Sequence, residues 1–230
     1  MSMTRPPRVA ISVAVALVIV AAVVWRMEAS RSALPGETSL EQLGDYGRVP
    51  AFSLTERSRR QVTRDDLRDH VSVIDFIYTD CAETCPAQSL EMAQLEREFE
   101  EARDLRLVSI TVDPRHDTPE VLARYAQRYQ ADDRWWFLTG DQHTIYCLAR
   151  DGFRLSVVDS STSPPAPCGG TLGLGPRAAW ASHGSKGLIM HSARLMLVDR
   201  VTRIRAYHLA TDTASLQALR RNLRRLLAGR

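Results

Sequence analysis

The segment that decides the fold is Val71–Pro86, VSVIDFIYTDCAETCP. Residues 71–79 are β-branched, aromatic or otherwise apolar almost throughout, which is typical of a strand buried on both faces of a sheet. Cys81 and Cys85 follow this strand, and Pro86 suits the first turn of a helix because the N–H groups of that turn have no partner within the helix. The segment therefore predicts a buried strand that passes into a helix, with two cysteines at the junction.

The rest of the chain alternates between strand and helix patterns. Thr118-Pro119 is a helix start, with a threonine cap before a proline at the first helical position. The expected elements are helices after Pro86, from Pro119, over 141–150 and over 213–228, and strands over 105–112, 136–138, 153–158, 195–198 and 204–208. This order, which ends in a hairpin and a helix, predicts an α/β sandwich. In open α/β sheets, active sites collect where core strands end, and the cysteine pair lies at such a position.

An apolar run near the amino terminus predicts a membrane anchor. Residues 9–25 are apolar except for Ser12, and Arg5 and Arg8 precede them. The length of the run and the absence of a small-residue cleavage pattern favour an uncleaved transmembrane helix over a cleaved signal peptide. Residues 1–8 would be a cytoplasmic tail, because positive charge stays inside. We therefore expect a single-pass protein of the cell inner membrane, with its domain on the periplasmic side.

Composition divides the remainder into a linker and one domain. Residues 26–49 are predicted to be a linker, because they are mostly polar and show no sustained hydrophobic period. One α/β domain is expected to span 50–230, with a surface insertion at 159–187 that is rich in proline, glycine and serine. The formal net charge is only +3, with acidic and basic side chains interspersed, so we expect no nucleic-acid partner.

Four cysteines, Cys81, Cys85, Cys147 and Cys168, would face an oxidising compartment, where paired cysteines form disulfides, metal sites or redox sites. At a helix amino terminus, Cys81 and Cys85 would face the same way, and the positive end of the helix is expected to lower their thiol pKa values. Spacing alone leaves a structural disulfide, a metal-free redox dithiol and a metal site open. A Cys147–Cys168 disulfide and a buried, unbridged Cys147 are equally open.

A metal site would need a third ligand, because two thiolates alone bind a soft ion weakly. His191 is the best candidate, since it follows the insertion and precedes a strand pattern, so that a loop could carry it over the cysteines. Soft thiolates select Cu(I), and imidazole suits both copper oxidation states. If the cysteine pair does bind a metal, Cys81, Cys85 and His191 would suit copper, whereas a structural zinc site would require a fourth ligand. A histidine taken alone is more often a loop or surface residue, so the residues by themselves leave the three alternatives open.

Four motifs in the same order resemble the Sco/SenC family. Thr79–Pro86, TDCAETCP, resembles the family's T-x-C-P-x-x-C-P motif, and Thr111–Glu120, TVDPRHDTPE, resembles S-V-D-P-x-x-D-T-P-E. Leu138–Gly140 is similar to the family's L-T-G segment, and His191-Ser192 followed by Leu197–Asp199 is similar to H-S…L-(I/V)-D. The resemblance covers roughly residues 50–227, and the combination of motifs is more specific than any one of them.

The resemblance implies a thioredoxin-like fold and copper, as Cu(I) or Cu(II), bound by Cys81, Cys85 and His191. It implies a role in maturing the copper centre of cytochrome c oxidase, with the copper-bearing oxidase subunit and other copper carriers as partners. It also implies an amino-terminal anchor.

The chain departs from the family pattern in two places. Ala82 stands where the family usually has proline, which would make the loop less rigid without touching the ligands. The insertion before His191 is long and brings in Cys168 and His183. Either of these residues could add a ligand to the site or shield it.

Three functions could use the cysteine pair. The first is a metallochaperone, which binds and delivers copper and is not an enzyme by turnover. The second is a thiol-disulfide oxidoreductase, in which Cys81 and Cys85 are a redox pair that keeps oxidase-subunit cysteines reduced. A peroxidase is the weakest alternative, because it needs one activated cysteine and no distant histidine. His191 separates the first two functions, since a dithiol reductant does not need it.

Several other residues have structural interpretations. Asp113 and Asp117 are expected to serve turns and caps. Trp135 and Trp136 are expected to be core and rim aromatics. The histidines expected at the surface are His70, His116, His143 and His208.

Overall fold

The computed structural model describes residues 40–81, 85–155, 168 and 193–229, and these described residues belong to one compact unit. The expected anchor at 9–25, the linker up to residue 39 and the insertion other than Cys168 lie outside the described residues. Within the described ranges, no helix has both the length and the apolar character that a bilayer crossing requires.

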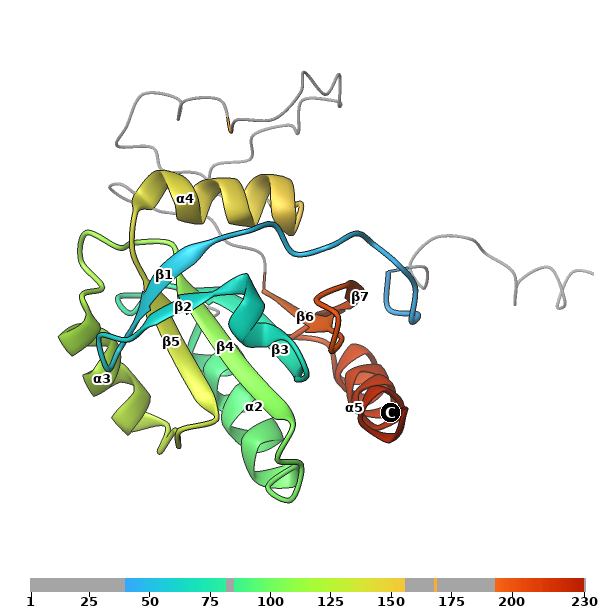
Figure 1. The fold of residues 1–230 in the computed structure, drawn as a ribbon. Helices are drawn as coiled ribbons and strands as arrows, with labels where there is room; N and C mark the ends of the chain where they lie inside the picture. Colours follow the sequence, from blue (N-terminus) through green and yellow to red (C-terminus); the bar gives the residue numbers. More distant parts are fainter. Residues whose placement is uncertain (1–39, 82–84, 156–167, 169–192, 230) are drawn as a thin grey trace, which may run out of the picture. The chain divides into compact units, whose positions relative to one another are not determined.

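The core is a seven-stranded sheet in the order β2-β1-β5-β4-β3-β6-β7 (Figure 1). The central strands β3, β4 and β5 are parallel, and the remaining pairs are antiparallel. The strands are β1 (Ser53–Glu56), β2 (Gln61–Thr63), β3 (Val71–Ile77), β4 (Leu105–Thr111), β5 (Trp135–Thr139), β6 (Arg194–Val198) and β7 (Ile204–Leu209).

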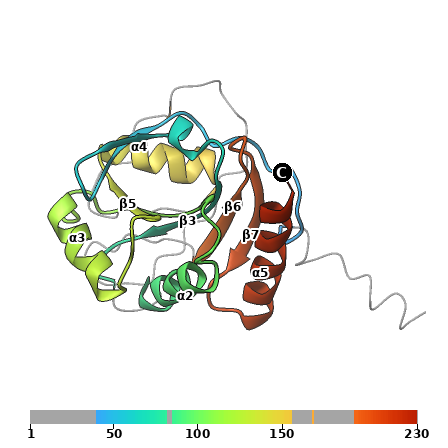
Figure 2. The same ribbon diagram turned by 60° about the horizontal axis from the view of Figure 1, so that its bottom comes forward.

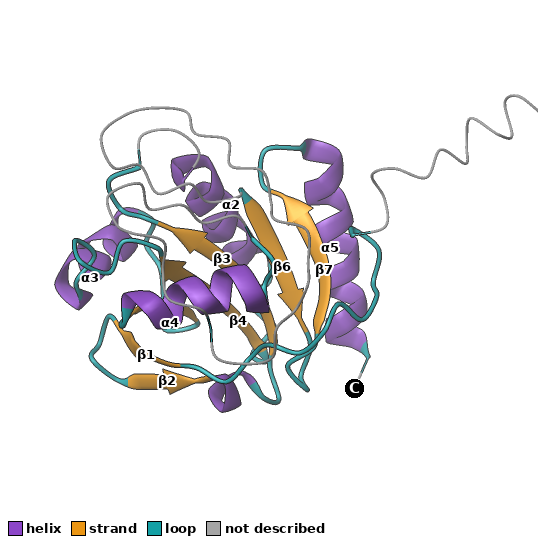
Figure 3. Ribbon diagram, turned by 90° about the horizontal axis from the view of Figure 1, so that it is seen from above, coloured by secondary structure: helices purple, strands orange, loops and turns teal. Residues whose placement is uncertain are grey.

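Helices cover both faces of the sheet, as the alternating pattern predicts. Helices α2, α3 and α5 lie on one face and α4 lies on the other (Figures 2 and 3), and each face has its own cluster of buried apolar side chains. The helices are α2 (Cys85–Glu98), α3 (Pro119–Arg128), α4 (Gln142–Cys147) and α5 (Thr213–Ala228), with a 3-10 turn at Arg64–Leu67 and a π turn at Leu148–Gly152.

The apolar segment over 71–77 forms β3, one of the three central parallel strands. Every residue of β3 is buried, because helices cover both faces of the sheet and β4 and β6 pair with its two edges. Ile77 of β3 pairs with Thr111 of β4, so these parallel strands end side by side. The loops that follow the carboxyl ends of β3 and β4 are therefore close together, and the first of these loops carries Cys81.

The predicted helix starts and the hairpin are confirmed. Thr118 caps α3 by accepting a hydrogen bond from the Val121 amide, and Pro119 is the first helical residue. Strands β6 and β7 pair as the expected hairpin, and Gly229 follows the last helical residue of α5. Trp135 is fully buried and Trp136 is partly buried, as predicted.

The strand predicted over 153–158 is not formed by its described residues, 153–155. The Phe153 amide donates to the Leu148 carbonyl oxygen and the Leu155 amide to that of Ala149. These amides bond to carbonyl groups of the π turn that follows α4, so they are not available to a sheet. The apolar character of this segment reflects packing instead, since Phe153 is fully buried.

Residues 40–49, which the sequence places in the linker, lie against β7. The Gly44 amide donates to the Arg205 carbonyl oxygen at 2.8 Å, and the Tyr46 amide donates to that of Ile204 at 2.9 Å. The Tyr46 and Tyr207 rings are in edge contact, with centroids 5.6 Å apart.

His208 is fully buried in β7 and not at the surface. The alternation of β7 turns its side chain inward, toward α5, where the Asn222 side-chain nitrogen lies 3.4 Å from His208 Nε2. Burial lowers the pKa of His208 to about 4, because a charged imidazolium is poorly solvated there. A lone histidine in a short strand carries no sequence signal for this burial.

Candidate metal and thiol site

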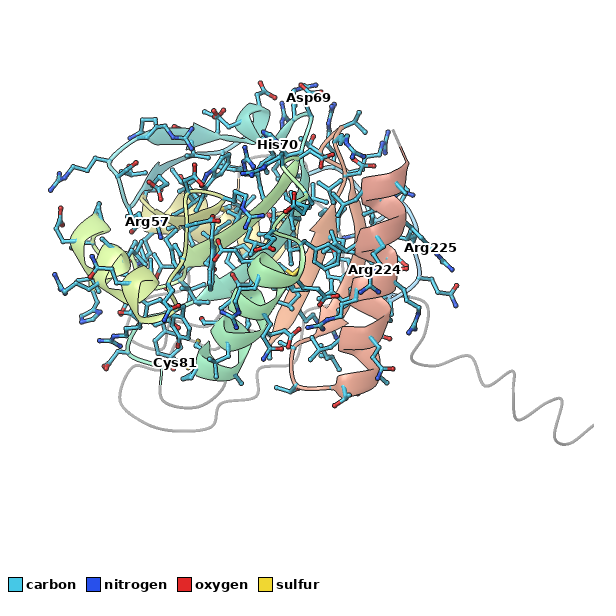
Figure 4. The ribbon with its side chains drawn as sticks, turned by 90° about the horizontal axis from the view of Figure 1, so that it is seen from below. Arg57, Asp69, His70, Cys81, Arg224 and Arg225 are labelled. Carbon is cyan, nitrogen blue, oxygen red and sulfur yellow. A yellow bond between two sulfur atoms is a disulfide. The ribbon has the colours of Figure 1, made fainter. Side chains whose placement is uncertain are left out.

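The two cysteines lie at the carboxyl end of β3, on the turn into α2. The Cys81 amide donates to the Tyr78 carbonyl oxygen at 3.3 Å, and Cys85 is the first residue of α2. Cys81 is 9% exposed and Cys85 is fully buried. Figure 4 shows Cys81 at the opposite end of the molecule from Asp69 and His70, the residues that precede β3. The junction predicted from the sequence is therefore formed, although residues 82–84 lie outside the described ranges.

The first amide of α2 faces the first cysteine, since the Cys85 N–H donates to Cys81 Sγ at 3.5 Å. A backbone donor at the positive end of a helix stabilises negative charge on a sulfur. Cys81, which is also the more exposed of the two, is thus the cysteine better placed to act as a thiolate.

Cys85 behaves differently from the expectation that both thiols become more acidic. Its pKa is raised, first by the hydrogen bond to Cys81 and second by burial. The hydrogen bond holds a proton on Cys85, and burial penalises a second negative charge beside Cys81. The prediction of a lowered thiol pKa is therefore wrong for Cys85, because the helix amide acts on the sulfur of its neighbour. An incoming metal ion or disulfide must displace the Cys85 proton.

A buried carboxyl group lies beneath the cysteine pair. Asp75 of β3 is fully buried, and its Oδ2 accepts a hydrogen bond from Gln88 Nε2 at 2.9 Å. Gln88 lies on α2 one turn after Cys85, so this bond ties the cysteine-bearing helix to the central strand. The negative charge of Asp75 also contributes to the raised pKa of Cys85. The sequence signal that could mark Asp75 is an ionisable residue inside a mostly apolar strand.

Asp117 fixes the loop that carries Cys81. It is fully buried, and its carboxylate accepts hydrogen bonds from the Thr79 amide (3.0 Å), the Thr79 hydroxyl (2.5 Å) and the Thr111 hydroxyl (2.5 Å). His116 Nδ1 lies 2.9 Å from the same carboxylate. Asp117 therefore joins Thr111, at the end of β4, to Thr79, two residues before Cys81. The sequence predicts only a turn or capping role for Asp117, and this long-range contact is an additional role.

His116 lies beside this loop, and its pKa is raised. Its hydrogen bond to Asp117 raises the pKa of the imidazole, and Asp113 and Asp80 raise it further through their charge. Protonated His116 can donate to Asp117 and balance its buried charge. The proposed third metal ligand, His191, lies outside the described residues, as does His183.

A disulfide joins Cys147 of α4 to Cys168, with Cα atoms 5.6 Å apart. Of the two interpretations left open by the sequence, the disulfide is confirmed. His143 lies one helical turn before Cys147, with Nε2 3.6 Å from Cys147 Sγ. In the part of the chain that the structure describes, His143, Cys147 and Cys168 form a group of three potential metal ligands, with donor atoms within 4.8 Å of one another.

The fold and the motifs agree with known proteins. A family model described as SCO1/SenC matches residues 41–172, more than half of the chain. A SCO1 protein homolog from Bacillus subtilis is 34% identical over 112 residues, which are 47% of this chain and 58% of the relative. The chain spans about half the length of the curated relatives that it matches.

Solved structures share the fold at lower identity. A SCO1/SenC family lipoprotein from Bacillus anthracis has a TM-score of 0.63 at 24% identity, and the match covers 78% of this chain and 94% of that one. Bradyrhizobium japonicum ScoI with copper bound has a TM-score of 0.58 at 23% identity, with 78% and 99% covered. The α/β sandwich is thus the thioredoxin-like fold of these proteins. Because the family model spans more than half of the chain and the four motifs follow in order, this chain belongs to the SCO1/SenC family.

Proposed function

We propose that this protein binds copper through Cys81, Cys85 and His191 and delivers it to the copper centre of cytochrome c oxidase. The observation that carries the proposal is the pair of buried thiols at the carboxyl end of β3, in a chain of this family. The copper bound to Bradyrhizobium japonicum ScoI, a protein with the same fold, supports it.

The chemistry of the pair suits a soft cargo ion. Cu(I) prefers thiolate ligands, and imidazole from His191 would keep the site usable after oxidation to Cu(II). Binding must release the proton that Cys85 holds, so copper affinity should rise with pH. Burial of both sulfurs limits solvent access, and Asp117 and Gln88 hold the two cysteine-bearing segments in place.

Copper binding by each thiol is tested by competition for Cu(I) against a chromophoric chelator. Cys81→Ser and Cys85→Ser should each abolish tight binding at this site, because each removes one of two sulfur ligands. Gln94→Ala, a change at an exposed position of the same helix, is the matched control and should bind as wild type does. Wild-type affinity in either cysteine variant would contradict the ligand assignment.

The second candidate is a thiol-disulfide oxidoreductase, favoured by the hydrogen bond between the two cysteines. The Cys81 thiolate would attack a partner disulfide and form a mixed disulfide with the release of one partner thiolate. Cys85 would then lose its proton and attack Cys81 Sγ. The products are a reduced partner dithiol and a Cys81–Cys85 disulfide, so the two electrons come from this protein.

His191→Ala separates the two functions in cells. It removes a proposed metal ligand but leaves both thiols. If delivery is the function, oxidase assembly under limiting copper should fail in His191→Ala cells. If assembly is as efficient as in wild-type cells, the reductase function replaces delivery.

We also propose that residues 9–25 anchor the domain on the periplasmic side of the inner membrane. The support is the apolar run and the preceding Arg5 and Arg8. A carboxyl-terminal alkaline phosphatase fusion, which is active only outside the cytoplasm, should be active. A mature soluble chain that begins after residue 25 would show a cleaved signal instead.

A further inference from the structure

We propose that His143, Cys147 and Cys168 form a second Cu(I) site, closed when the two cysteines are joined as a disulfide and opened when that disulfide is reduced. This site shares no ligand with Cys81, Cys85 and His191. It follows from the placement of three donor side chains around one end of α4.

The geometry brings a complete donor set to one point. His143 and Cys147 are four residues apart on α4 and share a helix face, with Nδ1 3.9 Å and Nε2 3.6 Å from Cys147 Sγ. The disulfide brings Cys168 Sγ to the same place, and the three donors lie within 4.8 Å of one another. Two sulfurs and an imidazole form a donor set that suits Cu(I).

A cationic side chain lies beside one of the two sulfurs. Arg150 Nη2 lies 2.8 Å from Cys168 Sγ, so a guanidinium faces the sulfur that would become a thiolate. A cation beside a sulfur stabilises negative charge on it. Two thiolates and one Cu(I) leave a net charge of minus one, and Arg150, which is also paired with Asp151 at 2.8 Å, places its guanidinium next to that charge.

Opening and loading of the site form a balanced sequence. A protein dithiol gives two electrons and two protons to the Cys147–Cys168 bond and becomes a disulfide, which leaves two thiols on this chain. Cu(I) then displaces one proton from each thiol and takes the neutral imidazole as its third ligand. In the oxidised state, neither sulfur is available as a thiolate, so the disulfide makes copper uptake at this site dependent on a reductant.

The test uses the full chain in detergent with Cys81→Ser and Cys85→Ser, which silence the first site and separate this proposal from the proposed function. Cu(I) is presented without oxygen, in competition with a chromophoric chelator, to protein that is either oxidised or reduced by a phosphine that is then removed. Reduction should expose two thiols. The reduced protein should bind one Cu(I), with thiolate-to-copper absorption in the ultraviolet, and the oxidised protein should bind none.

His143→Ala, added to this double variant, leaves the disulfide and both thiols intact. It should weaken Cu(I) binding by more than ~10-fold, since even loss of a residue that only supports a ligand costs ~10–100-fold. His70→Ala is the matched control and should have no effect. The proposal is overturned if the disulfide resists reduction, if the reduced protein takes up no Cu(I), or if His143→Ala binds as tightly as its parent.

Discussion

Asp117→Asn should destabilise the domain and loosen the loop that carries Cys81. The buried carboxylate accepts four hydrogen bonds, from the Thr79 amide and hydroxyl, the Thr111 hydroxyl and His116. An asparagine that keeps its oxygen at the Oδ2 position retains the Thr79 amide and Thr111 bonds. Its –NH₂ group would then face the Thr79 hydroxyl and His116, where Oδ1 now accepts.

The magnitude follows from these bonds. A hydrogen bond to a charged group contributes about 1.5–3 kcal/mol to stability, and the substitution loses or weakens two such bonds while removing the charge from the others. The Thr79 hydroxyl can rotate and donate elsewhere, which recovers part of the loss. We therefore expect the free energy of unfolding to fall by about 2–4 kcal/mol.

Two measurements on the purified chain check this expectation. Urea unfolding gives the change in stability, with Asp133→Asn, an exposed aspartate, as the matched control. NMR titration gives the pKa of His116, which should fall in Asp117→Asn because the hydrogen bond to Asp117 is the main cause of its raised value. A stability loss no larger than that of Asp133→Asn, together with an unchanged His116 pKa, would refute the role assigned to Asp117.

Three further predictions concern stability. Burial raises the pKa of Glu96 to about 7, so the stability that protonated Glu96 contributes is present below the unfolded value of 4.5 and is lost as pH rises through 7. Glu96→Gln should therefore raise the free energy of unfolding by about 1–2 kcal/mol near pH 8 and leave it unchanged near pH 4. Urea unfolding at the two pH values measures this difference. Because the pKa of buried His208 is lowered to about 4, the domain should lose stability as pH falls from 6.5 through 4. In His208→Gln, this acid-induced loss in the free energy of unfolding should be smaller by about 2–3 kcal/mol. An equally steep pH–stability curve in the variant would be evidence against burial of His208 as neutral imidazole. The Cys147–Cys168 disulfide closes a loop with a sequence separation of 21, which restricts the unfolded chain. The double serine variant should therefore be less stable than the oxidised wild type by about 3 kcal/mol in thermal unfolding. An unchanged melting temperature would contradict this prediction.

Much of the fold could be predicted because its signals are local. The apolar run over 71–79 can be stable only between two covering layers, and Thr118-Pro119 determines where α3 begins. The sequence does not predict the short strands β1 and β2, because three or four residues give no reliable period. It wrongly predicts a strand over 153–155, because periodicity cannot distinguish a strand from a buried turn.

The site could be predicted as a set of residue types but not as an electrostatic arrangement. The spacing of Cys81 and Cys85 correctly placed them at a strand–helix junction. It could not show that the Cys85 amide acts on Cys81, or that Cys85 itself keeps its proton. Asp117 appears in sequence as one acidic residue of a turn. Its importance depends on the pairing of β3 with β4, a contact between segments far apart in the chain.

The most direct test of copper binding by Cys81, Cys85 and His191 is the optical and EPR spectrum of the copper-loaded chain. The protein should carry Cys147→Ser and Cys168→Ser, so that only one thiol pair remains. We predict one Cu(II) per chain with a thiolate-to-copper charge-transfer band, retained in His183→Ala and lost in His191→Ala. A band that persists unchanged in His191→Ala, or a parent protein that binds no copper, would contradict this account.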